Sequence, residues 1–305
     1  MKERESARGR IRCGELGEDR LIARLAKKLH SSRQVIAGPG DDCAVLEGSH
    51  RDQFLLLKAD CVIEGVHFSP NEKPARVGWK AMMRVLSDFA AMAGRPQYAV
   101  VTLVVPGERE VGWLTRFYGG LERAARRFKV VIVGGETSGT NGPIVVSVSV
   151  VGVVERNRCV FRSGGKPGDV LFVTGELGGS RAGRHLDFVP RIEESRWLTA
   201  HFRIRAMMDL SDGLGADLPR LTKASGVGFR LYPDSLPRAK GCSIEEAISD
   251  GEDYELLFAI ARSEAGGLEK KWRKKFPRLR LTRIGLLARR SRTNVSLPSG
   301  FVHFQ

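Results

Sequence analysis

Two hydrophobic periods alternate along the first half of the chain. Apolar residues that recur every three or four positions predict helices over residues 19–30, 74–93 and 108–128. Continuous runs of apolar and β-branched residues predict strands over residues 54–58, 98–105, 130–133 and 144–154. This mixture predicts an α/β or α+β domain.

Turn-forming and charged residues separate this half from the second. The run RNRCVFRSGGKPGD at residues 156–169 predicts the boundary between one domain of residues 1–155 and another of residues 156–305. Two domains also suit a chain of 305 residues, because one domain has roughly 150 residues. Patterns beyond the boundary favour a compact α+β domain, with strands at 170–174, 206–208, 228–232, 254–260 and 279–285 and helices at 191–201, 213–225 and 263–276.

The composition argues against a disordered, an exported and a disulfide-rich protein. With 42% hydrophobic and 28% charged residues, the chain has the usage of a folded globular protein rather than a disordered one. We expect a soluble, cytoplasmic protein without membrane association, because the charged N-terminus lacks a signal peptide's apolar core and no apolar run reaches roughly 18 residues. The five cysteines are odd in number and never spaced C-x-x-C, which argues against a disulfide framework and a thiolate zinc site.

The charge balance favours an anionic or phosphorylated partner. Lys and Arg exceed Asp and Glu by 50 to 35, and twelve of the basic residues lie between Arg262 and Arg292. Trp272 and Phe276 alternate with these cations, as in proteins that bind single-stranded nucleic acid. Leu268, Trp272 and Phe276 also recur every four residues, as on the core face of an amphipathic helix. We favour the helix and expect no nucleic-acid partner, and a basic RNA-binding protein is kept as an alternative.

Carboxylates stand at the ends of several apolar segments. Asp41 and Asp42 follow glycines in a turn before Val45, and two adjacent acids repel each other unless a cation lies between them. Asp60 follows FLLLKA, where we expect a strand to end. Ordinary surface turns also explain both positions.

Asp88 interrupts an otherwise apolar helix, WKAMMRVLSDFAAMAG. Asp is unfavourable inside a helix, and burial of an unpaired carboxylate is costly. Two interpretations remain open: a surface ion pair with Arg84 or Arg95, or a buried Asp88 that is paired with a cation.

The segment MMDLSDGLGADL places three polar residues between a predicted strand and a predicted helix. Ser211 or Asp212 can cap the helix, whose first N–H groups also favour an anion. Asp209 is left over, and a pair of carboxylates beside a helix N-terminus suits a magnesium ion that carries phosphate. A second segment repeats this pattern after the strand VVIV, with Gly134, Gly135, Glu136 and Thr137.

Together the acids predict a site for several metal ions rather than a nucleophile: Asp41, Asp42, Asp60, Asp88, Glu136, Asp209 and Asp212. The sequence has no G-x-S-x-G elbow, no Walker A motif and no G-x-G-x-x-G after a strand. His67, in EGVHF, is a candidate ligand or substrate contact, although a loop histidine with a structural role is the simpler interpretation.

Long motifs run through nearly the whole chain: GPGDDCAVL (38–46), DCVIEGVHF (60–68), GWKAMMRVLSDFAAMAGRPQ (78–97), GGET (134–137), RSGGKPGDVLFVTGELGGS (162–180), MDLSDGLGADLPRLTKASGVGFRL (208–231) and SDGEDYELLF (249–258). In this order they resemble the thiamine-monophosphate kinase family. The resemblance implies the two-domain fold shared with aminoimidazole ribonucleotide synthetase, in which N-terminal domains pair into a β-barrel across a homodimer. It also implies transfer of a phosphoryl group from ATP to thiamine monophosphate.

The resemblance assigns roles to residues of this chain. Direct transfer assisted by Mg²⁺ would depend on Asp88, Asp209 and Asp212, and the implied metal ligands add Asp41 or Asp42, Asp60 and Glu136. We expect contacts with ATP from Gly134, Gly135, Thr137, Arg162 and Ser211, and also from Lys58, which departs from the family pattern. Contacts with thiamine monophosphate fall on His67, Asp253, Tyr254, Phe301 and Phe304. A general base is not required, because the acceptor phosphate is already an oxyanion.

Three features depart from the family pattern. Lys58 and Ala59 stand where the family usually has two hydroxyl residues, and an ammonium there can contact phosphate directly. Glu136 replaces an Asp and is one methylene longer, and the Arg that often follows GGET is missing. The acceptor therefore stays open between thiamine monophosphate and that of another ATP-dependent enzyme of the same fold, such as an aminoimidazole ribonucleotide synthetase-like one.

Overall fold

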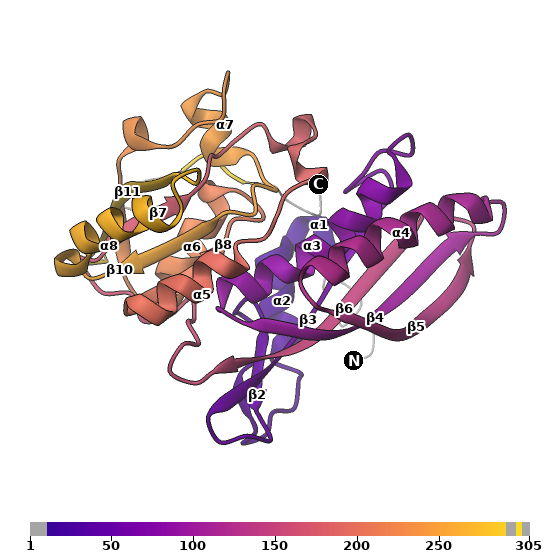
Figure 1. The fold of residues 1–305 in the computed structure, drawn as a ribbon, viewed down its shortest axis with the longest axis horizontal. Coiled ribbons are helices and arrows are strands. Elements are labelled where there is room, and N and C mark those ends of the chain that lie inside the picture. The colour runs from indigo at the N-terminus through magenta and orange to yellow at the C-terminus, as the bar shows by residue number, and fades with distance from the viewer. Residues whose placement is uncertain (1–10, 291–296, 301–305) are drawn as a thin grey trace, which may run out of the picture.

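The computed structural model describes residues 11–290 and 297–300 and arranges their strands in two sheets (Figure 1). The first sheet has the strand order β1-β2-β3-β6-β4-β5. β4 and β5 pair in parallel, and the other neighbours pair antiparallel. Its strands are β1 (Val35–Ala37), β2 (Ala44–Glu47), β3 (Gln53–Ile63), β4 (Arg95–Pro106), β5 (Val131–Thr140) and β6 (Val145–Glu155).

Two long helices, α3 (Pro74–Ala91) and α4 (Val111–Arg127), pack together on one face of this sheet (Figure 1). A Cβ atom at Gly78 would lie 2.0 Å from the carbonyl oxygen of Phe117. A Cβ atom at Gly120 would lie 1.9 Å from the carbonyl oxygen of Ala75. The two helix backbones therefore touch, and only glycine leaves room for this approach.

The second sheet is antiparallel throughout, with the strand order β8-β10-β7-β11-β9. Its strands are β7 (Val170–Thr174), β8 (Ile204–Asp209), β9 (Gly228–Leu231), β10 (Leu256–Ile260) and β11 (Leu281–Ala288). The longer helices of this half are α5 (Ile192–His201), α6 (Leu214–Ser225), α7 (Ile244–Ser249) and α8 (Arg262–Lys275). Single 3₁₀ turns occur at η1 (Ser180–Ala182), η2 (Arg184–Leu186) and η3 (Pro233–Ser235), and α1 (Cys13–Leu16) and α2 (Glu18–Ala26) precede the first sheet.

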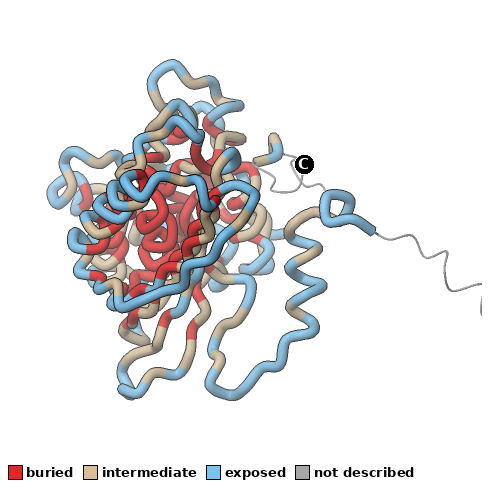
Figure 2. Tube along the Cα trace, turned by 90° about the vertical axis from the view of Figure 1, so that its right-hand side faces the viewer, coloured by how far each residue is buried: buried red, intermediate tan, exposed pale blue. Residues whose placement is uncertain are grey.

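Helix α3 joins the two halves of the molecule. It contacts β3 and β6 of the first sheet and also α5 and β8 of the second half. Every residue from Val77 to Ala91 is buried, and one apolar cluster includes residues of both halves. Figure 2 shows buried residues gathered in the interior of the molecule. A polar residue on α3 therefore lies in the interior and needs a partner there.

The periodic patterns predicted the long helices and strands, but two expectations about strand ends were wrong. β3 does not end before Asp60, because its pairing with β6 continues to Ile63. β5 does not end at the glycine pair but continues to Thr140 beside β4. A Cβ atom at Gly135 would lie 1.9 Å from the carbonyl oxygen of Val101, so this glycine permits the close approach of a neighbouring strand.

The basic segment near the C-terminus confirms the prediction of an amphipathic helix. Leu268 and Trp272 of α8 are buried, and Trp272 Nε1 donates a 2.8 Å hydrogen bond to the carbonyl oxygen of Leu279. Phe276 packs on Trp272 with ring centroids 4.7 Å apart. These aromatic rings serve the core rather than a nucleic-acid surface. Among the described residues, no helix has both the length and the apolar composition of a bilayer span.

Candidate functional site

A cavity of about 610 Å³ lies between the two halves, within the size range of small-molecule sites. Its walls come from β3 and α3 on one side and from the end of β8 and from α6 on the other, with α2 at its edge. Acidic residues in the lining are Glu18, Asp19, Asp41, Asp60, Asp88, Asp209 and Asp212. Basic residues in the lining are Lys58, Arg84, Arg162, Arg220 and Lys223.

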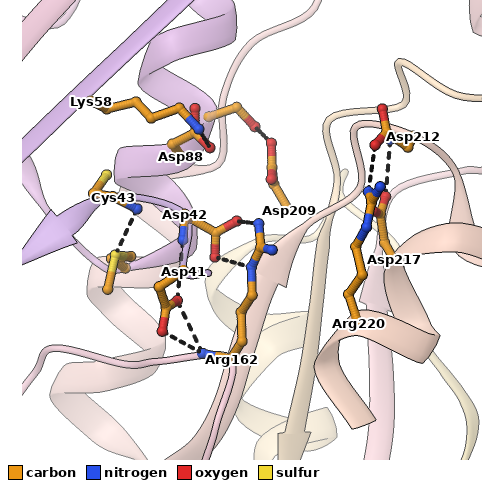
Figure 3. Close-up of polar contacts among 12 residues, drawn as sticks. Asp41, Asp42, Cys43, Lys58, Asp88, Arg162, Asp209, Asp212, Asp217 and Arg220 are labelled. Carbon is orange, nitrogen blue, oxygen red and sulfur yellow. Dashed lines mark hydrogen bonds and ion pairs between the residues drawn. The ribbon is translucent and has the colours of Figure 1, made fainter. Parts of the chain in front are cut away.

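Three buried carboxylates converge beside this cavity. Asp42 comes from the turn before β2, Asp88 from α3 and Asp209 from the end of β8. One oxygen of each lies within 4.8 Å of the others. Figure 3 shows these side chains directed toward one another from separate elements. Of the two alternatives for Asp88, the buried, cation-paired one is confirmed.

The electrostatics of this group call for a cation. Burial raises the pKa of Asp209 to about 7, and the neighbouring Asp42 carboxylate adds to the rise. Burial also raises the pKa of Asp88 well above its ordinary value, although Lys58 opposes the effect. Carboxylates this close resist joint ionisation unless positive charge lies among them. Oxygen ligands on one Mg²⁺ lie up to about 4 Å apart, which is close to the spacing of these carboxylate oxygens, so the donor set suits that ion.

Protein groups already contact each member of the group. Lys58 Nζ lies 2.8 Å from Asp88 Oδ1, and Arg162 Nη2 donates a 2.7 Å hydrogen bond to Asp42 Oδ1 (Figure 3). The Ser87 hydroxyl donates a 2.5 Å hydrogen bond to Asp209 Oδ2. These contacts fix the orientation of the carboxylates, which is how residues behind a metal ligand tune its affinity.

The structure distinguishes the two acids of the GDD turn. Asp42 is 1% exposed and belongs to the buried group, whereas Asp41 accepts the backbone N–H of Arg162 at 3.2 Å. Burial and the adjacent Asp42 raise the pKa of Asp41 to about 6. The two side chains point in different directions, so only Asp42 faces Asp88 and Asp209.

Asp60 lines the same cavity outside the buried group. Its Oδ2 accepts a 3.2 Å hydrogen bond from Arg84 Nε of α3. Because Asp60 lies within β3 and two residues after Lys58, both side chains leave the strand on the face that meets α3.

Asp212 lies on the opposite wall, paired with Arg220 of α6. The predicted helix cap at Ser211 or Asp212 is wrong, because α6 begins after Gly213 and Gly213 holds the N-cap position. The buried Asp217 carboxylate instead accepts the Asp212 N–H at 3.0 Å, and Arg220 bridges Asp212 and Asp217. Ser211 and Asp212 therefore present their side chains to the cavity.

The glycine-rich segment of β5 lies elsewhere. Gly134, Gly135, Glu136 and Thr137 are all exposed, and they stand outside the set of described residues that line the cavity. Glu136 Oε1 accepts a 3.4 Å hydrogen bond from the Ser138 hydroxyl of the same strand. The single chain thus does not bring Glu136 to the aspartates.

The residues predicted to contact thiamine monophosphate do not all lie at the cavity. Tyr254 lines the cavity and, with His67, a smaller recess beside it. His67 Nδ1 accepts the N–H of Ile63 at 3.1 Å. Asp253 is buried, where it accepts hydrogen bonds from the Ser180 hydroxyl and the Gly178 N–H, and burial raises its pKa to about 7. Phe301 and Phe304 lie outside the described residues.

Two buried cations of α3 were not predicted as part of the site: Lys80 was not singled out from the sequence, and Arg84 was considered only as a surface partner of Asp88. Lys80 Nζ lies 2.7 Å from Glu252 Oε1 and donates a 2.6 Å hydrogen bond to the carbonyl oxygen of His67. Arg84 holds Asp60, as described above. Lys80, Arg84 and Asp88 recur every four residues, so they share one face of the helix. That spacing within an apolar helix was the signal that could have revealed them.

Comparisons with known proteins agree with this geometry. Residues 40–154 match the family described as AIR synthase related protein, N-terminal domain. Thiamine-monophosphate kinase of Rhodopirellula baltica is 37% identical in an alignment that covers 94% of this chain and 97% of the relative. The Salmonella typhimurium enzyme is 35% identical over 286 residues, which cover 84% of this chain and 86% of the relative.

A solved structure confirms the expected fold of the single chain, whereas the pairing of N-terminal domains into a β-barrel stays a prediction. AaThiL complexed with AMPPCP and TMP matches with a TM-score of 0.83 and 34% sequence identity, covering 97% of this chain and 99% of that chain. Similarity of this extent, in sequence and in fold, places the chain in one family. The protein belongs to the thiamine-monophosphate kinase family.

Proposed function

We propose that the protein transfers the γ-phosphoryl group of ATP to thiamine monophosphate, producing ADP and thiamine diphosphate. The observation that carries this proposal is the convergence of Asp42, Asp88 and Asp209 beside a cavity of about 610 Å³. The relative AaThiL, complexed with the ATP analogue AMPPCP and with TMP, supports the choice of both substrates.

Charge is the main obstacle to this reaction. The γ-phosphate and the acceptor phosphate are both anionic, so transfer requires neutralisation and in-line alignment of the reacting oxygens. Mg²⁺ held by Asp42, Asp88 and Asp209, with Asp60 and Asp212 beside them, would supply that neutralisation. Since the acceptor oxygen is already ionised, the chain needs no general base.

The chain's own residues bind and orient the two substrates. We assign the ATP phosphates to the Arg162 guanidinium and the Ser211 hydroxyl, which line the cavity from the second half of the molecule. The acceptor is assigned to the part of the cavity wall formed by Arg84 and Tyr254, which with His67 also line a small recess beside the cavity. Asp253 positions this wall through its hydrogen bonds to Gly178 and Ser180.

A homodimer is part of the proposal. The face of the first sheet opposite α3 and α4 exposes apolar side chains: Leu57, Tyr98, Val100, Val131 and Val133, each between 42 and 59% exposed. Apolar surface of this kind favours a partner surface. β5 forms one edge of the same sheet, so pairing there would bring Glu136 and the glycine pair to an interface. Light scattering coupled to size-exclusion chromatography tests the dimer.

The reaction is tested by incubating purified protein with ATP, Mg²⁺ and thiamine monophosphate and separating thiamine diphosphate by chromatography. Asp209→Asn should lower turnover at least about 100-fold, the scale of a lost electrostatic contact in a transition state. Asp187→Asn, at a surface acid 59% exposed, is the matched control and should retain activity. ATP turnover only with a different acceptor would support the same-fold alternative. RNA binding that weakens steeply with salt, without ATP turnover, would support the other alternative.

A further inference from the structure

Two ion pairs of opposite polarity join β3 to α3. On β3, Lys58 and Asp60 are two residues apart and therefore lie on one face of the strand, with the buried Leu56. On α3, Arg84 and Asp88 are four residues apart and share one face of the helix. Lys58 pairs with Asp88 at 2.8 Å and Asp60 with Arg84 at 3.2 Å.

The strand holds the ammonium in place. Residue 58 cannot turn away from α3 without moving Leu56 and Asp60 from the same face. The side chains of Lys58 and Asp88 are 26% and 9% exposed, so solvent screens this pair little. Lysine side chains are ordinarily protonated at neutral pH, and the 2.8 Å contact with the Asp88 carboxylate favours the charged form. The positive charge is therefore permanent at neutral pH.

The ammonium occupies one oxygen of a carboxylate that we assign to the metal site. Lys58 contacts Asp88 Oδ1, so one of the two Asp88 oxygens already has a cationic partner, while Asp88 also offers an oxygen to the group with Asp42 and Asp209. With a neutral side chain at position 58, both oxygens of Asp88 would be free to bridge two divalent ions, as carboxylates do in two-metal sites. A second divalent ion next to the ammonium is repelled by a like charge at short range.

We propose that the Lys58 ammonium is a built-in cation that takes the place of one divalent ion at Asp88, so that this protein loads one ion fewer than it would with a neutral residue 58. This inference rests on the proposed metal site. Lys58 then supplies part of the charge neutralisation that the reaction requires, and it does so without depending on the concentration of free metal.

The test counts bound ions with Mn²⁺ as the probe. Electron paramagnetic resonance of free Mn²⁺ gives the number bound per chain at saturating AMPPCP, for the wild type, Lys58→Thr and Lys58→Met. We expect both variants to bind about one Mn²⁺ more than the wild type, Met included, because the gain comes from the removed charge. Lys223→Met removes a positive charge from an exposed residue of the same cavity and should leave the count unchanged. Equal counts in wild type and Lys58 variants would overturn the proposal.

A second measurement uses the wild type alone, in case the variants fail to fold. In a crystal soaked with Mn²⁺ and AMPPCP, the electron density should show Lys58 Nζ still in hydrogen-bond contact with Asp88 Oδ1, and the anomalous signal should show no Mn²⁺ on that oxygen. A Mn²⁺ peak on Asp88 Oδ1 would overturn the proposal. Neither readout depends on turnover with thiamine monophosphate. A failure of the proposed reaction is therefore distinguishable from a failure of the proposed role of Lys58.

Discussion

The Ser87 hydroxyl donates a 2.5 Å hydrogen bond to Asp209 Oδ2, which links α3 to the end of β8 across 122 residues of sequence. Both residues are buried. Ser87→Ala removes a donor that orients a proposed metal ligand, and such changes lower metal affinity by about 10- to 100-fold. We expect the Mg²⁺ concentration for half-maximal activity to rise by at least about 10-fold, with a smaller change in kcat at saturating Mg²⁺.

Ser195→Ala is the matched control for this prediction. Ser195 is also buried, but its hydroxyl donates to the carbonyl oxygen of Ile192 within α5. Its removal should leave the Mg²⁺ dependence unchanged. If the two variants shift that dependence equally, the Ser87 bond does not act through Asp209.

Asp209→Asn should stabilise the protein in the absence of divalent ions. Burial raises the folded-state pKa of Asp209 from 3.8 to about 7, so the folded state holds more protons than the unfolded state between those values. The free energy of unfolding therefore falls as pH rises through this window, and the whole cost is present above pH 7. At pH 8 with a chelator, the Asn variant should unfold at a temperature higher by a few degrees.

Addition of Mg²⁺ should reverse that order. The ion binds the folded wild type and raises its unfolding temperature, whereas Asp209→Asn loses a charged ligand and gains little. Calorimetry with and without Mg²⁺ measures both effects. An Asn variant that is less stable than the wild type under both conditions would show that the Asp209 carboxylate is satisfied by the protein alone.

Glu155 should contribute stability that is lost in acid. Burial favours its protonated form, but bidentate hydrogen bonds from Arg196, at 3.0 and 3.2 Å, outweigh burial and lower the pKa of Glu155 to about 2. This stabilisation is complete above the unfolded pKa of 4.5 and disappears as pH falls toward 2. Glu155→Gln should destabilise the protein by about 1–2 kcal/mol at pH 7, after allowance for partial exposure.

Thermal unfolding between pH 7 and pH 3 tests this prediction. The difference between wild type and Glu155→Gln should shrink below pH 4.5, the unfolded pKa. Glu122→Gln breaks an exposed pair with Arg126 and should change stability by less than about 0.5 kcal/mol at any pH. A constant difference across the pH range would exclude an electrostatic origin.

Replacement of two adjacent glycines of α4 by alanine should change the stability of the protein in opposite directions. At Gly120 a Cβ atom would lie 1.9 Å from the carbonyl oxygen of Ala75, so Gly120→Ala must push α3 and α4 apart and should cost about 3 kcal/mol or more. At Gly119 nothing lies within 4 Å of the added Cβ atom, and Gly119→Ala should stabilise the helix by up to about 1 kcal/mol. Urea unfolding measures the free energy of unfolding of both variants. If both variants were stabilised, helix propensity rather than packing would dominate at Gly120.

The periodic patterns predicted the long elements and the position of several candidate residues. α3 was evident because its apolar residues continue around the helix, which is typical of burial on all sides. The short strands β1 and β2 and the helix α7 were not predicted, since three to six residues contain too little of either period. The ends of β3 and β5 were misplaced because pairing with a neighbouring strand carried each one past a polar or glycine residue.

The sequence alone thus determines the helices, most strands, the carboxylates at the ends of apolar segments and the family motifs. Each of these depends on residues a few positions apart. Packing alone selected Asp42 rather than Asp41, paired Asp212 with Arg220, and placed Lys58 against Asp88. Those choices join residues on different elements, as in the pairs that link Asp42 to Arg162 and Asp209 to Ser87. The partner of a carboxylate depends on which surfaces meet in the folded interior. The hydrophobic periodicity of the chain does not predict these contacts.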